Sequence, residues 1–473
     1  MASGMNFWDS QIWSFVITIT LLLIFMMVAN TLRNVSPFIK KLMIPSSVLG
    51  GFIALFVGFL FTKLTGREMF SGITLEALTY HGLGLGFAAM SLRTLEKQKG
   101  KKEKSGAFDS GVAVVGGYLL QGVLGLAITI TLYYVLGGFF ASGLLLPMGY
   151  GQGPGQAYNW GRTYENTYGF VSGTSFGLTL AAVGFIAASV GGIVYLNVMR
   201  RNGKFSGTMG QDVLDEHLTA EMITGKDEIP LLESMDKLTV QIALVFIAYI
   251  LAFLFMSGVN MVIETGVLGS FGYNTVRPLI WGFNFLFATI FALVLKAVLR
   301  GLKNRGIIKR EYANNFMQTR ISGFLFDIMV VASIAAINLR AFSNTNFIVP
   351  LAVLCIVGAV ATYFYLKIVS RRVFKNYQDE AFLSLYGMQT GTAATGIILL
   401  REIDPRFETP AANNIVYHQP WAIVFGFPML LLLGIAPKGV SSSLVTLAIL
   451  SVLFILMCII LFRRDIFKRK KSK

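Results

Sequence analysis

Two short glycine-rich stretches combine permissive backbone with neutral polar side chains. They are Gly149–Gly161 (GYGQGPGQAYNWG) and Gly387–Gly396 (GMQTGTAATG), and they interrupt apolar runs at matching places in the two halves of the chain. Lipid cannot satisfy free backbone N–H and C=O groups, so a broken segment at membrane depth must be buried in protein or line a polar cavity. Paired breaks of this kind indicate a binding site for a transported solute.

The residues in these breaks suit an anion better than a cation. Helix ends expose unpaired N–H groups and concentrate partial positive charge, so an anion binds there without a lysine. Glycines let ligand and backbone approach closely. The candidate binding residues are Gln152, Gly153, Gly155, Gln156, Asn159, Gln389, Thr390, Gly391, Thr392 and Thr395. The competing interpretation is that the glycines only allow close packing of helices.

Asp327 is the main candidate for an ion or proton site. It falls about 16 Å into a span that starts near Phe316, at 1.5 Å rise per residue, and so lies close to the bilayer centre. A carboxylate there is unfavourable by several kcal/mol unless it is paired or solvated. A structural pair with Arg320 is the alternative. Asn338 and Asn413 are further polar residues that join Asp327 as candidate ion ligands, although single asparagines in spans more often bond a neighbouring helix.

Catalytic chemistry has little support. Gly173-Thr174-Ser175-Phe176-Gly177 fits the G-x-S-x-G nucleophile motif, but that motif needs a strand-to-helix turn and a histidine base, whereas this copy opens an apolar helix. Helix packing through small residues explains it better. The chain has only three histidines, and its two cysteines lie inside apolar runs, so no Cys/His metal site or disulfide framework is predicted. We expect a protein that is not an enzyme.

The composition of the chain indicates that the candidate binding residues lie among membrane helices. Of the 473 residues 55% are hydrophobic and 14% are charged, and the mean hydropathy is +0.66. Such a chain is an all-α polytopic membrane protein embedded in a lipid bilayer. About eleven apolar runs are long enough to span; they begin near residues 11, 44, 73, 109, 171, 238, 276, 317, 347, 413 and 442. The net charge of +16 reflects loop topology rather than nucleic-acid binding.

The basic clusters fix one orientation. They alternate with loops nearly free of lysine and arginine, which places the N-terminus outside and the C-terminus inside. The first break then enters from outside and the second from inside, so the two halves have opposite topology. The hexapeptides Ala88–Arg93 (AAMSLR) and Ala335–Arg340 (AAINLR), each one span before its break, support an internal repeat.

Four sequence regions follow from this pattern. Residues 1–199 form the first inverted repeat, with a re-entrant hairpin over about 141–165, and residues 238–436 form the second, with a hairpin over about 380–403. Residues 200–237 form an acid-rich cytoplasmic linker, with a short amphipathic helix expected near Gln211–Ile223. Residues 437–473 form an extra transmembrane helix and a basic cytoplasmic tail.

The chain resembles the bacterial sodium/glutamate symporter family. The likeness rests on Ile44–Gly51 (IPSSVLGG), on Gly82–Gly86 (GLGLG) leading to Leu92-Arg93, and on the two glycine-rich stretches, and it extends over most of residues 11–436. It implies two inverted five-helix repeats, a homodimer in the bacterial inner membrane, and sodium-coupled uptake in which a transport domain moves against a scaffold. It also implies that substrate lies between the hairpin tips. The sequence departs from the family in its first hairpin, which lacks the expected histidine, and in its final span.

The residues and the resemblance together predict a sodium-coupled symporter for glutamate or a related small carboxylate, with Asp327, Asn338 and Asn413 holding the coupling sodium. A proton-coupled carrier or exchanger, in which Asp327 takes a proton, is the first alternative. An anion channel lined by broken helices is the second.

Overall fold

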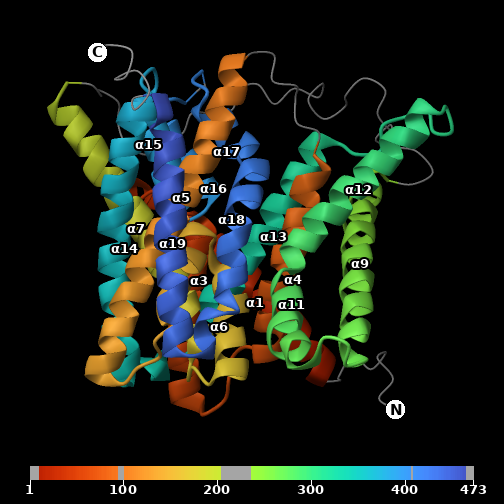
Figure 1. Cartoon of the computed structure of the whole chain (residues 1–473). Helices are drawn as coiled ribbons and strands as arrows, with labels where there is room; N and C mark the ends of the chain where they lie inside the picture. The colour runs from red at the N-terminus through yellow and green to blue at the C-terminus, as the bar shows by residue number, and fades with distance from the viewer. Residues whose placement is uncertain (1–9, 94–100, 204–235, 406–407, 465–473) are drawn as a thin grey trace. The chain divides into compact units, whose positions relative to one another are not determined.

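The structure is a computed structural model, and it describes residues 10–93, 101–203, 236–405 and 408–464. These residues form helices and connecting segments, with no strand among them. Within this described part, ten helices are long and apolar enough to cross a bilayer (Figure 1). The chain is therefore a multi-pass helical membrane protein, as composition predicts. The linker helix expected near Gln211–Ile223 and the end of the basic tail lie outside the described residues.

The chain divides into two compact units, and each unit takes segments from both halves of the sequence. The first unit comprises Met1–Ser71, Lys97–Asp212 and Ser333–Lys473, and the second comprises Gly72–Glu96 and Val213–Ala332. Both glycine-rich stretches belong to the first unit. Neither compact unit therefore corresponds to one of the two expected repeats, residues 1–199 and 238–436.

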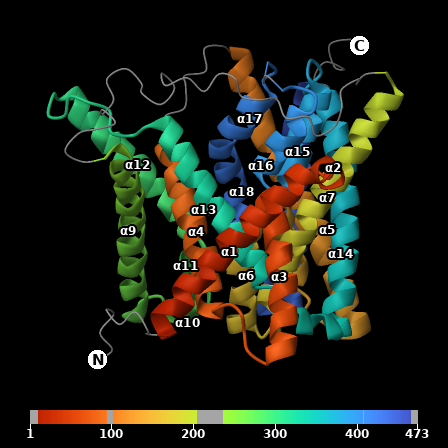
Figure 2. The ribbon, with the colours of Figure 1, turned by 180° about the vertical axis from the view of Figure 1, so that it is seen from behind.

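The first unit contains most of the helices. They are α1 (Ser10–Val35), α2 (Pro37–Lys41), α3 (Ser46–Thr65), α5 (Lys101–Leu136), α6 (Pro154–Tyr168), α7 (Gly173–Arg201), α14 (Thr345–Val373), α15 (Gln378–Thr390), α16 (Ala393–Arg401), α17 (Ala411–Tyr417), α18 (Gln419–Leu433) and α19 (Val440–Leu461). Figure 2 shows α1 and α3 side by side, and Gly50 explains their close approach: a methyl group at Gly50 would lie 3.0 Å from the Met26 Cα atom.

Long helices of the first unit contact the segments that contain the breaks. Helix α5 packs against α14, α18 and α19, and α7 packs against α6 and α15. The expected extra helix, α19, lies along α5 in Figure 1. Because its outer face carries exposed Val445, Val452 and Ile459, a lipid-facing position suits it.

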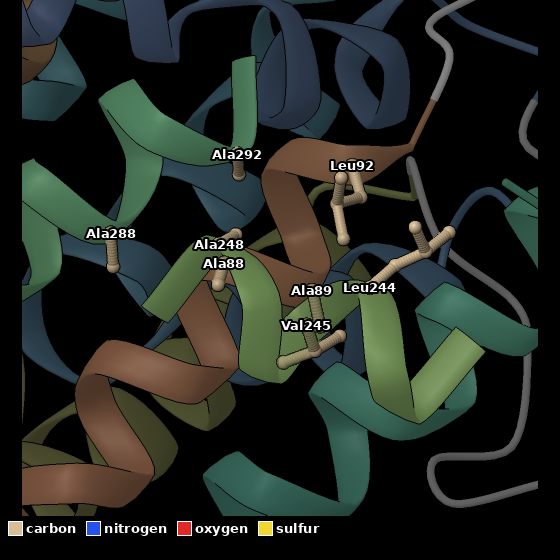
Figure 3. Close-up of a cluster of buried hydrophobic side chains, with 8 residues drawn as sticks. All are labelled: Ala88, Ala89, Leu92, Leu244, Val245, Ala248, Ala288 and Ala292. Carbon is tan, nitrogen blue, oxygen red and sulfur yellow. The ribbon is translucent and has the colours of Figure 1, made fainter. Parts of the chain in front are cut away.

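The second unit is built from α4 (Gly72–Leu92), α9 (Lys237–Glu264), α10 (Gly269–Phe271), α11 (Arg277–Gly282), α12 (Asn284–Asn304) and α13 (Asn315–Ala335), the last three residues of α13 being assigned to the first unit. Its core is rich in alanine, which lets helix axes approach closely. Figure 3 shows this cluster, formed by Ala88, Ala89, Leu92, Leu244, Val245, Ala248, Ala288 and Ala292.

Three of the expected spans differ from simple apolar helices. The run near residue 73 forms α4. This helix is not among the ten that are apolar enough to cross a bilayer, because polar residues such as Glu76 and His81 lower its hydropathy. The run near 276 is interrupted at Phe283, between α11 and α12. The run near 413 is divided at His418, between α17 and α18, where Pro420 lies in the first turn of α18. Proline is tolerated there because the first N–H groups of a helix need no partner within the helix.

Candidate functional site

The first glycine-rich stretch is a helix broken at Gln152 and Gly153. A π-helical turn, Pro147–Gly151, precedes the break, and α6 begins at Pro154. The Gln152 N–H closes the turn by donating to the Pro147 carbonyl at 3.1 Å. Proline at the first position of α6 suits the fixed backbone angle required there. The sequence therefore ends one helix and starts another within two residues.

The second stretch is broken in the same way at Gly391 and Thr392. Helix α15 ends at Thr390 and α16 begins at Ala393. The two helices touch through glycine: a methyl group on Gly387 would lie 2.8 Å from the Gly396 Cα atom. The packing interpretation of the glycines is thus correct for Gly387 and Gly396, which allow α15 and α16 to lie against each other.

The two breaks meet. Gly153 has φ +88° and ψ −179°, a region that only glycine adopts readily. A methyl group built on Gly153 would lie 3.5 Å from the Thr392 Cγ2 atom and 3.8 Å from the Gly391 carbonyl oxygen. Residues separated by more than two hundred positions in sequence are therefore within van der Waals reach at this point.

Gln156 is the most unusual polar side chain near this junction. It lies in the first turn of α6, is 1% exposed, and neither Nε2 nor Oε1 has a hydrogen-bond partner in the described structure. An unsatisfied buried amide costs about 1–3 kcal/mol, so such a group calls for a ligand or ordered water. Asn159 is buried one turn further along α6. The first turn of α6 also carries the partial positive charge of its helix.

The second break contributes two hydroxyl groups. The Oγ1 atoms of Thr392 and Thr395 lie 3.4 Å apart, and Thr395 is fully buried. Two other candidates donate hydrogen bonds to partners outside this junction. The Thr390 hydroxyl donates to the Tyr386 carbonyl of its own helix at 2.7 Å, and Gln389 Nε2 donates to the Ala113 carbonyl of α5 at 3.3 Å. Thr392 and Thr395 are therefore better placed than Gln389 and Thr390 to meet a ligand beside Gly153.

Gln121 is a polar residue that the sequence reasoning missed. It is buried in α5, and its Nε2 atom donates to Thr362 Oγ1 at 2.9 Å and to the Gln389 carbonyl at 3.1 Å. It is the only amide side chain between Asp109 and Leu136, within a long apolar run. Its position as a single amide in an apolar span could have identified it from sequence, because such a group needs a hydrogen-bond partner within the protein.

The candidate sodium ligands are distributed over both units. Asp327 lies on α13 in the second unit, and Asn338 and Asn413 lie in the first. The Asn338 Oδ1 atom accepts from the Arg340 N–H at 3.0 Å, and its own N–H donates to Ser175 Oγ at 3.0 Å. Within the described residues no group of three or more His, Cys, Asp or Glu side chains is arranged to hold a metal. A sodium site at Asp327, Asn338 and Asn413 stays a prediction.

The segment that contains Ser175 has a packing role. A methyl group on Gly161 of α6 would lie 3.0 Å from the Thr174 Cα atom of α7, and the Thr174 N–H donates to Glu165 at 2.9 Å. Ser175 itself is buried and accepts the bond from Asn338. Methyl groups on the motif's own Gly173 and Gly177 would collide with the Gly161 and Ala157 carbonyl oxygens of α6, so these two glycines allow α6 and α7 to pack closely.

No protein-family model matches the chain, and no curated protein is similar enough to count as a match.

Proposed function

We propose that the chain is a secondary active transporter that binds a small carboxylate, such as glutamate, where its two breaks meet, and that couples its uptake to sodium. The observation that carries this proposal is the approach of Gly153 to Gly391 and Thr392, together with the buried amide of Gln156, three residues further along α6, which has no hydrogen-bond partner in the described structure.

Two helix starts supply the attraction for a carboxylate. Helix α6 begins at Pro154 and α16 begins at Ala393, each directly after its break. The N–H groups of a first helical turn have no partner within the helix, and the dipole favours negative charge there. Paired half-helix starts serve anionic substrates in transporters with broken helices. The Gln156 amide and the Thr392 hydroxyl add neutral hydrogen-bonding groups.

An inverted-repeat architecture with re-entrant hairpins and a homodimeric scaffold is part of the same proposal. One pair of contacts favours it: Tyr150, in the first break segment, donates to the Cys355 carbonyl of α14 at 2.8 Å, and Gln389, in the second, donates to the Ala113 carbonyl of α5. Each break is thus tied to the long helix that precedes the other break. Such reciprocity is expected of two repeats related by a pseudo-two-fold axis.

The proposal is tested by ligand-induced stabilisation of the purified protein over a panel of carboxylates, because a ligand that binds only the folded state raises the unfolding midpoint. We expect at least one small carboxylate to stabilise the protein in sodium. Replacing Gln156 with Leu should abolish that shift while leaving the ligand-free midpoint unchanged or higher, since the variant removes an unsatisfied buried amide.

Gln241→Leu provides the matched control. Gln241 is also fully buried, but its Oε1 atom accepts from the Asn314 N–H at 2.9 Å and from Gln318 Nε2 at 3.0 Å. This variant should lower the ligand-free midpoint and retain the carboxylate shift. If no carboxylate stabilises the protein, or if both variants behave alike, the proposed binding site is wrong.

A further inference from the structure

The backbone carbonyl of Gln389 lies where α15 is broken. Gln389 is the next-to-last residue of α15, and the last carbonyl groups of a helix have no donor within that helix. In the described part of the chain no backbone N–H donates to it, because the Gly391 N–H bonds the Gly387 carbonyl and α16 begins its own bonds at the Thr392 carbonyl. Gln389 is also fully buried, so its carbonyl needs a donor from elsewhere in the protein.

Gln121 of α5 supplies that donor. Its Nε2 atom donates to the Gln389 carbonyl at 3.1 Å and to Thr362 Oγ1 of α14 at 2.9 Å. A carbonyl oxygen can only accept, so turning the amide of Gln121 over would place one oxygen against another. The side chain of Gln121 therefore caps the end of α15 from a different helix.

The same amide also touches the first break. A methyl group on Gly151 would lie 3.2 Å from Gln121 Oε1, and Gly151 is the last residue of the π-helical turn before Gln152 and Gly153. Gln121 thus contacts both broken segments, although these lie more than two hundred residues apart in sequence.

We propose that Gln121 is a positioning residue that fixes the end of α15, and with it the second break, against the first break. Its effect on carboxylate binding rests on the proposed function, whereas its effect on the break itself does not. The cap also reduces an unfavourable charge. The carbonyl groups at the end of a helix carry partial negative charge, and this one lies two residues before Gly391, where a carboxylate is proposed to bind.

Hydrogen exchange in the purified, ligand-free protein tests this role. Gln121→Met keeps the length of the side chain but removes the donor. The amides of Gly387–Gly396 should then exchange about three- to tenfold faster, the effect expected for loss of one neutral hydrogen bond. The carboxylate concentration that gives half of the maximal stabilisation should rise by a similar factor, because less of the protein holds the second break in place.

Thr362→Val is the matched control. Thr362 is also fully buried and accepts from the same nitrogen of Gln121, but it belongs to α14 and lies outside both breaks. Valine is close to threonine in size, so this variant removes the bond between α5 and α14 and leaves the cap on α15. Exchange of Gly387–Gly396 and the half-saturating carboxylate concentration should equal those of the unmodified protein.

Gln121→Glu separates the loss of the donor from a change in packing. Glutamate matches glutamine in size, but its carboxyl group donates to the Gln389 carbonyl only when it is protonated. Protection of Gly387–Gly396, corrected for the intrinsic exchange rate, should therefore rise towards that of the unmodified protein as pH is lowered. Gln121→Met, compared at each pH, should show no such recovery.

Three results would overturn this role of Gln121. They are unchanged exchange of Gly387–Gly396 in Gln121→Met, exchange that rises equally in Thr362→Val or throughout α5 and α14, and faster exchange of the break with an unchanged half-saturating carboxylate concentration. Faster exchange confined to the break in Gln121→Met, in a protein that no carboxylate stabilises, would uphold the positioning role and refute the proposed function.

Discussion

Gly153 is the residue on which the junction of the two breaks depends. Its backbone angles belong almost exclusively to glycine, while the space around its Cα atom would admit a methyl group, the nearest atom lying at 3.5 Å. Gly153→Ala should therefore destabilise the protein by about 1–3 kcal/mol through backbone strain alone. Carboxylate-induced stabilisation should fall with it, because the start of α6 would move. Thermal unfolding with and without ligand measures both effects.

Gly426→Ala is the control for this variant. Gly426 lies within α18, and the nearest atom to a methyl group there is 3.7 Å away, so that alanine fits both the space and the helix. This variant should leave the midpoint unchanged or raise it. Equal midpoints for the two alanine variants would contradict the backbone argument.

Glu380 should make stability depend on pH. It lies in the first turn of α15, which is not among the ten helices that are long and apolar enough to cross a bilayer. Partial burial raises its pKa above the ordinary value of 4.5, and the nearby carboxylates of Asp379 and Asp404 raise it further. A raised carboxyl pKa favours the protonated folded state, so this contribution is complete below pH 4.5 and is lost as pH rises through the pKa of the folded protein.

Glu380→Gln should thus raise the midpoint at neutral pH and flatten its pH dependence, as measured by thermal unfolding over pH 4 to 8. The neighbouring Asp379 gives a contrasting control: it accepts a hydrogen bond from Tyr195 at 2.6 Å, so Asp379→Asn weakens a bond to a charged group and should lower the neutral-pH midpoint. An unchanged pH dependence in Glu380→Gln would refute the assignment.

At the scale of elements, α19 is joined to α5 by ion pairs as well as by apolar packing. Asp109, whose side chain is 4% exposed, accepts from Arg463 Nη2 at 2.7 Å and lies 3.4 Å from Arg464 Nη2. Arg463 also stacks on the Phe108 ring, 5.1 Å from its centroid. A buried carboxylate is strongly unfavourable once its partner is removed.

Arg463→Ala should consequently cost about 1.5–3 kcal/mol of stability and increase hydrogen exchange near the end of α19. Arg464→Ala should have a smaller effect, because Arg464 is more exposed and its contact is longer. Exchange of α19 amides that is unaffected by Arg463→Ala, or a larger loss from Arg464→Ala, would show that these pairs do not hold the helix.

At the scale of the whole molecule, the sequence predicted the helical membrane architecture and the position of both breaks, because hydrophobic run length and glycine content are local properties. The hydrogen bonds from Gln121 to Thr362 and to the Gln389 carbonyl were not predicted, because both partners lie more than two hundred residues away in sequence. Helix α4 belongs to the second unit, whereas α3 and α5, which precede and follow it in sequence, belong to the first. This assignment was not predicted either, because it depends on packing between helices and not on the hydrophobic periodicity of α4.

Uptake of labelled glutamate and related carboxylates into proteoliposomes, with sodium either equal on both sides or higher outside, is the most direct test of sodium-coupled carboxylate transport by this protein. We predict accumulation of at least one small carboxylate above its external concentration only with the inward sodium gradient, and loss of that uptake in Gln156→Leu with the protein still folded. Absence of uptake for every carboxylate, accumulation that follows a proton gradient without sodium, or full uptake by Gln156→Leu would contradict it.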